Sequence, residues 1–389
     1  MRKTATILGA AIFAASAGLA EVRLDVVYLK IEQDLPPVLS NLDPIPPNLG
    51  VAGAEVGLQD NTTTGRFLGH SFGFETNHVP QGADPTGAAR QALSKTAFLI
   101  IDGSADNVMA IADLPEAKGA ILFNVASGDN GLREENCRAN LLHTLPSDSM
   151  RTDALAQFLA TRRWDRLAMV SGTHPRDLAF AQALRTSLTK FGLGLRSEKT
   201  WTFDADMRRN AAQEVPLFTQ GLKDHDVLLI ADEIHDFGRY IVYNTWEPRP
   251  VAGSEGLTAQ AWSEVVEQWG AAQLQSRFED HAGRSMRSED YAAWAAMRSL
   301  GEAVTRTNSA ETETVRNYIL GTDFELAGFK GRALSFRPWN GQLRQPIALV
   351  HPRAMVAMAP LEGFLHPVSA LDTLGRDAPE SNCKAFGNR

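Results

Sequence analysis

The feature that most constrains the fold of this chain is an alternation of short, continuously apolar segments with amphipathic segments of helical period. Apolar runs without polar alternation are typical of strands buried on both faces of a parallel sheet. Their regular alternation with helices predicts an α/β protein with right-handed crossovers. The predicted strands are RLDVVYL (23–29), AFLIID (97–102), GAILFNV (119–125), DRLAMVSG (165–172) and DVLLIAD (226–232).

Helical spacing of apolar residues predicts helices over 147–164, 176–192 and 288–306. Ser147 or Asp148 is available to cap the first of these, and Gly192 stands at the end of the second. A further helix is predicted from residue 49, ending in a polar turn at DNTTTG (60–65) that sends the chain back toward a second strand.

The N-terminus has the pattern of a secretory signal peptide. Arg2 and Lys3 precede a short apolar stretch, and Gly18 and Ala20 are small residues at the positions that signal peptidase reads. We expect cleavage after Ala20 and a mature, exported chain that begins at Glu21, which is not the Cys of a lipoprotein. The alternatives are a membrane anchor or a buried first strand, but the stretch is too short to span a bilayer comfortably.

Charge and length narrow the function classes. The formal charge of −8 becomes −10 once Arg2 and Lys3 are removed, and no Lys/Arg cluster is present. Such a surface argues against binding to nucleic acid or anionic membranes. No later stretch is apolar enough to be a transmembrane helix, so the mature chain is not expected to be membrane-embedded. Its 369 residues suffice for two substantial lobes.

The chain has two cysteines, Cys137 and Cys383. In an oxidising compartment an even pair suggests one disulfide, which would tie the last residues to the middle of the chain. The chain-entropy model gives such a long loop a stabilisation of roughly 4–5 kcal/mol as an upper figure. The alternative is a buried thiol and an unrelated thiol in the tail.

Small or hydroxyl residues follow four predicted strands. In open parallel sheets ligands bind beyond the carboxyl ends of the strands, where hydroxyls and backbone N–H groups at helix starts can hold a small polar head group. Ordinary helix capping is the alternative at each position. The positions are Gly103-Ser104, Ala126-Ser127, Gly172-Thr173 and Ala231-Asp232.

Signatures of common enzyme classes are missing, including the nucleophile elbow, the phosphate loop, the dinucleotide fingerprint and the zinc-protease motif. A compact polar cluster, Asp232, Glu233, His235 and Asp236, could bind a metal ion or a ligand ammonium group, or form a solvated helix start. Trp246 and Trp339 stand in loop-like contexts where stacking on a ligand is an option, although most tryptophans serve packing. We expect no catalytic residues, metal or cofactor.

With these residues in view, the sequence resembles the type I periplasmic substrate-binding proteins of ABC transporters, the leucine/isoleucine/valine-binding superfamily. The likeness rests on the opening strand, GVAGAEVGLQDNTTTGRFLG (50–69), the order of strand ends, and HTLPSDSMRTDALAQFL (143–159). A closer likeness, to the branch associated with PQQ-dependent alcohol dehydrogenase systems, is carried by DNTTTGRFLG, WEPRPVAGSEGLTAQAW, FKGRALSFRPWNGQLRQPI and LDTLGRDAPESNC.

The resemblance implies two doubly wound α/β lobes, joined by a three-crossover hinge, that close around a ligand. It implies a monomeric periplasmic protein that passes a small polar solute to ABC permease and ATPase subunits without making or breaking a bond. The implied boundaries are a signal peptide at 1–20, lobe I at 21–146 and 275–335, lobe II at 147–274 and 336–365, and a C-terminal tail at 366–389.

The resemblance also implies ligand contacts, position by position. Ser104 with Ala126 and Ser127 would hold a ligand carboxylate, Thr173 and His174 would contact it from lobe II, and Asp232 or Glu233 would pair with an ammonium group. The sequence departs from the amino-acid binders in its sparse hydroxyls after the third strand and in a longer, proline-rich loop after the first strand. The alternative function is a periplasmic accessory or sensor protein that keeps the fold but docks on a quinoprotein dehydrogenase or another protein.

Overall fold

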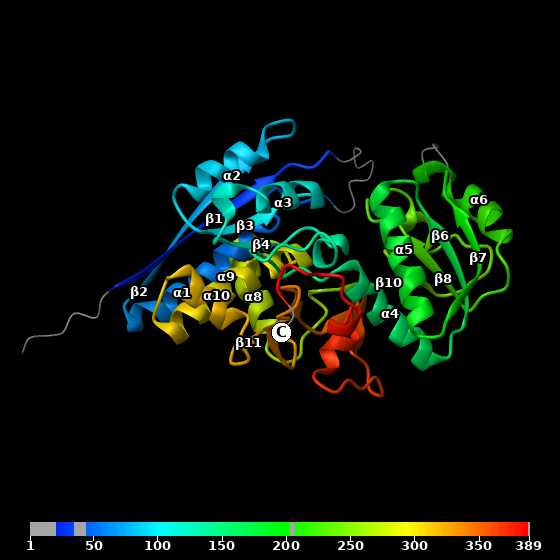
Figure 1. The fold of residues 1–389 in the computed structure, drawn as a ribbon. Helices are drawn as coiled ribbons and strands as arrows, with labels where there is room; N and C mark the ends of the chain where they lie inside the picture. The colour runs from blue at the N-terminus through cyan, green and yellow to red at the C-terminus, as the bar shows by residue number, and fades with distance from the viewer. Residues whose placement is uncertain (1–20, 35–43, 203–206, 388–389) are drawn as a thin grey trace, which may run out of the picture.

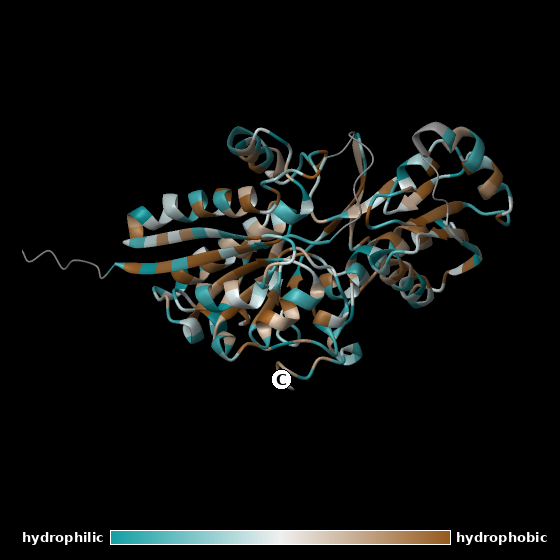
Figure 2. Ribbon diagram, turned by 90° about the horizontal axis from the view of Figure 1, so that it is seen from above, coloured by the Kyte–Doolittle hydropathy of each residue, from teal (hydrophilic) through white to brown (hydrophobic). Residues whose placement is uncertain are grey.

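The computed structural model describes residues 21–34, 44–202 and 207–387, with side chains omitted for 207–209. Two separate sheets, each covered by helices on both faces, form two lobes that the chain enters in turn (Figure 1). Apolar strands lie inside both lobes, and polar residues gather on the outer helices (Figure 2). The predicted signal peptide lies outside the described residues. Within them, no helix combines the length and apolarity needed to cross a membrane.

Lobe I contains a five-stranded, wholly parallel sheet in the order β2-β1-β3-β4-β5. Side chains alternate along β1, so Leu24, Val26 and Tyr28 pack under α1, α8 and α9, while Val27 and Leu29 pack under α2 and α3. The elements are β1 (Val22–Ile31), α1 (Val51–Leu68), β2 (His70–Val79), α2 (Pro85–Leu93), β3 (Phe98–Asp102), α3 (Ala105–Ala112), β4 (Ile121–Asn124), β5 (Leu141–His143), α8 (Ala271–Ala282), α9 (Ser288–Thr307) and α10 (Thr312–Ile319).

Lobe II contains a seven-stranded sheet in the order β15-β14-β10-β9-β8-β6-β7. The strands from β6 to β10 run parallel, and β14 and β15 add an antiparallel edge. Helices α4 and α5 cover one face of this sheet, and α6 and α7 cover the other. The elements are α4 (Asp148–Arg162), β6 (Arg166–Ser171), α5 (Pro175–Lys190), β7 (Gly194–Thr200), α6 (Met207–Gln220), β8 (Val227–Ala231), α7 (Gly238–Ile241), β9 (Val251–Gly253), β10 (Leu257–Gln260), β14 (Ile347–His351) and β15 (Ala354–Ala359).

Three chain segments cross between the lobes, after β5, after β10 and before β14. The first and third are hydrogen-bonded to each other, because the Gln345 amide donates to the Thr144 carbonyl (2.7 Å). The buried Lys330 ammonium, between β11 and β12, donates to Gln345 Oε1 and to the Pro346 carbonyl of the third crossing. A small antiparallel sheet packs into the lobe I core just before the third crossing. Its strands are β11 (Leu326–Ala327), β12 (Ala333–Phe336) and β13 (Leu343–Arg344).

The lobe boundaries implied by the resemblance remain predictions. In the structure, the lobe I core includes Trp262 and Val266 between β10 and α8, and it continues past Leu343 to Ala348 and Val350 on one face of β14. The core of lobe II resumes at Ile347. The predicted α/β fold class is confirmed, with parallel sheets in both lobes.

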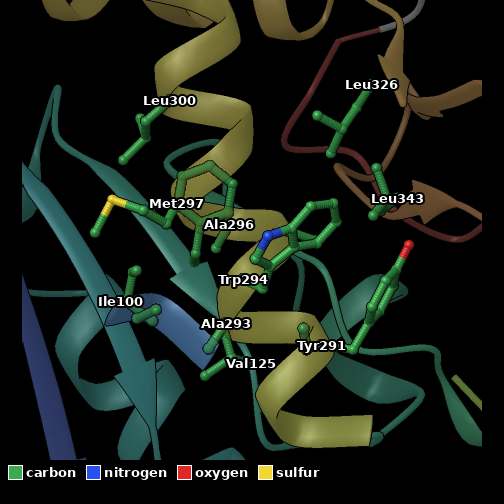
Figure 3. Packing of buried hydrophobic residues seen from close by; sticks show 14 of the residues in the cluster. Ile100, Val125, Tyr291, Ala293, Trp294, Ala296, Met297, Leu300, Leu326 and Leu343 are labelled. Carbon is green, nitrogen blue, oxygen red and sulfur yellow. The ribbon is translucent and has the colours of Figure 1, made fainter. Parts of the chain in front are cut away.

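Helix α9 is the structural centre of lobe I and is buried on nearly all sides. Figure 3 shows Trp294 and Met297 of α9 between Ile100 of β3 on one side and Leu326 and Leu343 of the small sheet on the other. A helix buried all round needs an apolar surface on every face, and alanines on α9 allow its neighbours to approach closely.

All five predicted strands are present as β1, β3, β4, β6 and β8, and the three predicted helices correspond to α4, α5 and α9. Ser147 caps α4 by accepting a hydrogen bond from the Met150 N–H (3.2 Å). The turn predicted at DNTTTG was wrong, because α1 continues through it to Leu68 and ends at Gly69, which has a positive φ of 74°. Tertiary contact stabilises this polar turn of helix: the buried Asn61 amide donates to the Met297 carbonyl of α9 (2.8 Å).

Candidate functional site

The predicted ligand residues of lobe I lie at the carboxyl ends of β3 and β4. Ser104 is the N-cap of α3, and its hydroxyl accepts a hydrogen bond from the Asn107 N–H (3.3 Å). It is partly buried, and its position after β3 is the one that the sequence predicts. The contact recorded for its hydroxyl is a capping bond, the alternative considered from sequence.

The backbone N–H groups after β4 are already used within the protein. Those of Ala126 and Ser127 both point to Oδ1 of Asn124, at 3.3 and 2.9 Å. The other end of this fully buried amide donates to the Ser127 carbonyl (2.8 Å) and lies 3.1 Å from Nδ1 of His143. Burial lowers the pKa of His143 well below its usual value, so its neutral ring can accept that bond. Asn124 thus occupies the donors that were predicted to hold a ligand carboxylate.

On lobe II, Thr173 and His174 follow β6 as the sequence predicts. Thr173 is exposed, while His174 is the N-cap of α5 and accepts the Arg176 N–H at Nδ1 (3.3 Å). Both residues stand at the carboxyl end of the lobe II sheet, the end that binds ligands in open α/β folds.

Asp232 and Glu233 follow β8, but only Glu233 is partly exposed. The fully buried Asp232 carboxylate accepts three backbone N–H groups, from Asp236, Phe237 and Gly238, at 2.7–2.9 Å. Burial raises its pKa, and these three bonds oppose the rise. Asp232 therefore holds the loop after β8 in shape and is fully engaged by it.

Glu233 forms an ion pair with Arg151 of α4. The two carboxylate oxygens accept from the two guanidinium nitrogens at 2.6 and 3.1 Å, and the Ser254 hydroxyl adds a third bond of 2.8 Å. Although burial acts in the opposite direction, Arg151 and Ser254 lower the pKa of Glu233 to about 2. Arg151 also contacts Asp148, at 3.3 Å, and lies over the Phe180 ring.

A second charged group lies on lobe I, at the end of β1 and β3. Asp102 accepts hydrogen bonds from the Tyr28 hydroxyl (3.0 Å) and the Lys30 ammonium (3.1 Å), and Lys30 also donates to the Leu49 carbonyl (2.8 Å). Burial raises the pKa of Asp102, while Lys30 and Tyr28 oppose the rise. Lys30 of lobe I is therefore paired with a carboxylate, as Arg151 of lobe II is paired with Glu233.

Glu289, in the first turn of α9, connects the two groups electrostatically. Burial raises its pKa, the carboxylates of Asp290 and Asp102 add to the rise, and the Arg151 guanidinium of lobe II opposes it. The sequence analysis did not single out Glu289, because acidic residues are ordinary in the first turn of a helix. The packing of α9 against the first and second crossings, where Thr144 donates to the Ala292 carbonyl and the Ala261 N–H donates to Ser288, brings this carboxylate within electrostatic range of Asp102 and Arg151.

The remaining candidates lie elsewhere. Among the residues the structure describes, no three His, Cys, Asp or Glu side chains come together as a group that could hold a metal ion; His235 and Asp236 are exposed, and Asp232 serves the backbone. Trp246 borders a small surface pocket with Leu222 and His225, at the amino end of β8, away from Glu233. The ring of Trp339 lies under the guanidinium groups of Arg337 and Arg344.

No protein-family model matches the sequence, and no curated protein matches it. Solved structures do match. The chain has the type I periplasmic binding protein fold.

Three of these structures match along nearly their whole length. A periplasmic binding protein from Burkholderia mallei has 13% identity and a TM-score of 0.67, with 94% of this chain and 99% of that chain covered. A branched chain amino acid ABC transporter periplasmic ligand-binding protein from Burkholderia xenovorans LB400 has 15% identity, a TM-score of 0.68 and coverage of 94% and 100%. A solute binding protein of an ABC transporter from R. palustris, in complex with benzoate, has 12% identity, a TM-score of 0.64 and coverage of 93% and 99%.

Proposed function

We propose that this protein is the periplasmic substrate-binding component of an ABC transporter, which captures a small polar solute between its two lobes by hinge closure. It would present the solute to the permease and ATPase subunits without chemical change. The observation that carries the proposal is the two-lobed binding-protein fold, in which Asp102 ends β3 of lobe I and pairs with Lys30, while Glu233 follows β8 of lobe II and pairs with Arg151.

The charge balance between the lobes favours an uncharged or cationic solute. The cations Lys30 and Arg151 are engaged by carboxylates, and the Ala126 and Ser127 N–H groups are engaged by Asn124. A ligand carboxylate would have to displace one of these partners and leave a buried group unpaired, which is costly. A hydroxyl or ammonium group, in contrast, could donate to Glu289.

The sequence likeness to the branch associated with PQQ-dependent alcohol dehydrogenase systems adds a metabolic setting. Under this proposal the solute is linked to alcohol oxidation, and the charge balance favours an alcohol or amine over the corresponding acid. The solute would be captured after export of the mature chain to the periplasm.

The first experiment is native mass spectrometry of the mature chain purified from a periplasm, before and after partial unfolding. A bound mass that unfolding releases identifies the ligand directly. A thermal-shift panel of alcohols, amines, amino acids, carboxylic acids and the quinone then tests the class. We expect alcohols or amines to raise the melting temperature, and a response confined to carboxylic acids would contradict the proposed class.

Glu289→Gln tests the site. The amide keeps the shape of the side chain but removes the negative charge, so we expect affinity for a solute found in the first experiment to fall at least tenfold, measured by isothermal titration. The matched control is Glu313→Gln in the first turn of α10, which is exposed. Equal affinities for wild type and both variants would place the ligand elsewhere.

One observation favours the second candidate function, a periplasmic accessory or sensor protein that docks on a protein partner. Asn124 and Arg151 satisfy Ser127 and Glu233 internally, as expected if the site has lost its solute. The absence of any bound mass and of any thermal shift, together with a stable complex with a dehydrogenase, would favour this function.

A further inference from the structure

The C-terminal segment, residues 361–387, crosses from lobe II to lobe I; we call it the C-terminal strap. It follows β15 and runs beneath the junction of the lobes (red in Figure 1). Its first contacts are with α4 and with the end of α5 in lobe II.

The first part of the strap binds lobe II. The Leu361 N–H donates to the Gln157 amide oxygen of α4 (3.0 Å), and the Gln157 nitrogen donates to the Thr373 hydroxyl (2.9 Å). Phe364 packs edge-on against Phe191 at the end of α5 (5.4 Å between ring centres). Leu374 is fully buried in the lobe II core.

The same turn binds lobe I. The Asp372 carboxylate accepts from Arg337 (2.9 Å), which follows β12, and from Arg344 of β13 (2.8 and 3.0 Å), in the small sheet that packs into the lobe I core. Arg337 also donates to the carbonyls of Leu371 (3.1 Å) and Leu374 (2.6 Å). Asp372 and Arg337 are almost completely buried. Adjacent residues, Asp372 and Thr373, are thus attached to different lobes.

Gly375 lies in the contact between the lobes. Its N–H donates to Asp153 of α4 and its carbonyl accepts from Lys190 of α5 (2.8 and 2.7 Å). With φ at 81°, a Cβ here would lie 2.9 Å from Met150 Cγ and 3.3 Å from an Arg337 nitrogen. Only a residue without a side chain fits between these two neighbours.

The end of the strap is fastened to lobe I. Cys383 forms a disulfide with Cys137, as the sequence analysis expects, and the neighbouring Asn382 N–H donates to Glu134 (2.7 Å). Phe386 packs against the lobe I core next to Gly341. The strap is therefore bound to lobe II by non-covalent contacts and to lobe I by a covalent bond.

We propose that the C-terminal strap restrains the motion of the two lobes, with Asp372 as its central attachment and the disulfide as its anchor. Thr373 is attached to α4, and Asp372 is attached to the arginines beside the β12–β13 turn. If the lobes move so that the distance between α4 and this turn changes, either the chain at Asp372 and Thr373 must stretch or Asp372 must separate from its arginines. Separation would leave buried charges unpaired, which opposes it strongly. The strap therefore narrows the range of interlobe positions that the hinge alone would permit.

Two variants of the full mature chain test this, Asp372→Asn and the C137S/C383S double variant. The distance between the lobes is measured without ligand by double electron–electron resonance. Azidophenylalanine replaces Lys118 of lobe I and Lys223 of lobe II, which are both exposed, and each carries a nitroxide label. We expect the width of the distance distribution to at least double in each variant. Hydrogen exchange over residues 361–387 is followed in parallel and should become faster.

Asp113→Asn is the matched control, since Asp113 pairs with Arg138 within lobe I, beside the disulfide. Its distribution should equal that of wild type. An unchanged distribution in folded Asp372→Asn overturns the role of Asp372, and an unchanged one in C137S/C383S overturns that of the anchor. If Asp372→Asn does not fold, C137S/C383S decides, because it keeps every contact of Asp372.

The strap matters for transport only through the hinge closure of the proposed function. The measurement contains no ligand, so the two proposals fail separately. Restrained lobes that bind no solute would support the strap and refute transport. Solute binding with unrestrained lobes would do the reverse.

Discussion

At the scale of single residues, neighbouring acids after β8 have different roles because their partners differ. Asp232 accepts hydrogen bonds from three backbone N–H groups and fixes the conformation of the loop after β8. Glu233 instead forms an ion pair with Arg151 of α4. The Glu233 N–H in turn donates to Asp177 of α5 (2.7 Å). Burial raises the pKa of Asp177 to about 6, with the Asp232 charge adding to the rise against two backbone hydrogen bonds.

Asp177 should make folding stability depend on pH. Its pKa of about 6 in the folded protein lies above the ordinary value of 3.8 for an aspartate, so the folded state binds more protons than the unfolded state between these two pH values. The stabilising contribution of Asp177 to the free energy of unfolding is fully present below about pH 4 and is lost as the pH rises through about 6. One pKa unit corresponds to about 1.4 kcal/mol. Between pH 4 and pH 7.5 the free energy of unfolding of Asp177→Asn should therefore rise by up to about 3 kcal/mol relative to that of wild type. Urea unfolding at the two pH values measures this difference.

Asp84→Asn provides a control of opposite sign. Hydrogen bonds from Thr86 lower the pKa of Asp84, so its contribution is present above its unfolded pKa and is lost on acidification. Relative to wild type, this variant should lose stability as the pH rises toward about 4, and it should change little between pH 4 and pH 7.5. A difference between Asp177→Asn and wild type that is the same at pH 4 and pH 7.5 would contradict the raised pKa of Asp177.

At the scale of elements, lobe I depends on the close approach of α1 and α9. Gly53 and Gly57 of α1 contact the backbone and side chains of α9, and Gly301 of α9 contacts Asn61. A Cβ on Gly53 would lie 1.9 Å from the Asp290 carbonyl oxygen. Because Asp290 also binds the Gly50 N–H and Arg284, this contact joins the starts of both helices.

Gly53→Ala should therefore destabilise the protein. The added methyl group meets backbone atoms, which cannot move aside as a flexible side chain can, so we expect a loss of about 2–3 kcal/mol in the free energy of unfolding. Gly194→Ala, at the exposed start of β7 with no atom within 4 Å of its Cβ, should change it by less than about 0.5 kcal/mol. Equal effects of the two variants in denaturant unfolding would show that α1 and α9 can separate without cost.

At the scale of the whole molecule, the Cys137–Cys383 disulfide closes a loop of 246 residues that contains all of lobe II. A cross-link over so long a loop restricts the unfolded chain strongly. The strap adds native contacts to both lobes, so the covalent bond and the Asp372 attachment act on the same segment.

The C137S/C383S variant should lose up to about 5 kcal/mol of unfolding free energy in the chain-entropy model. Equilibrium denaturation without reductant measures it, and dithiothreitol should reduce wild type to the stability of the variant. Dithiothreitol should leave the variant itself unchanged. A loss in the variant much smaller than about 2 kcal/mol would indicate that the unfolded chain is compact without the cross-link.

The sequence by itself determined the α/β class, the buried parallel strands and most helix positions, because period and apolarity are local properties of the chain. It also indicated which residues follow the strands, from Ser104 to Glu233, and the parity of its two cysteines permitted the pairing found. It did not indicate that α1 continues through DNTTTG, since the bond from Asn61 to Met297 depends on a helix far away in the chain.

Only the tertiary structure decided what each polar group binds. Asn124 takes the N–H groups of Ala126 and Ser127, and the pKa of Glu289 responds to charges on both lobes. The attachment of Asp372 to one lobe and of Thr373 to the other likewise depends on where the crossings place α4 and the small sheet. Hydrogen bonds and ion pairs are set by distances between atoms remote in sequence, and residue spacing along the chain does not encode those distances.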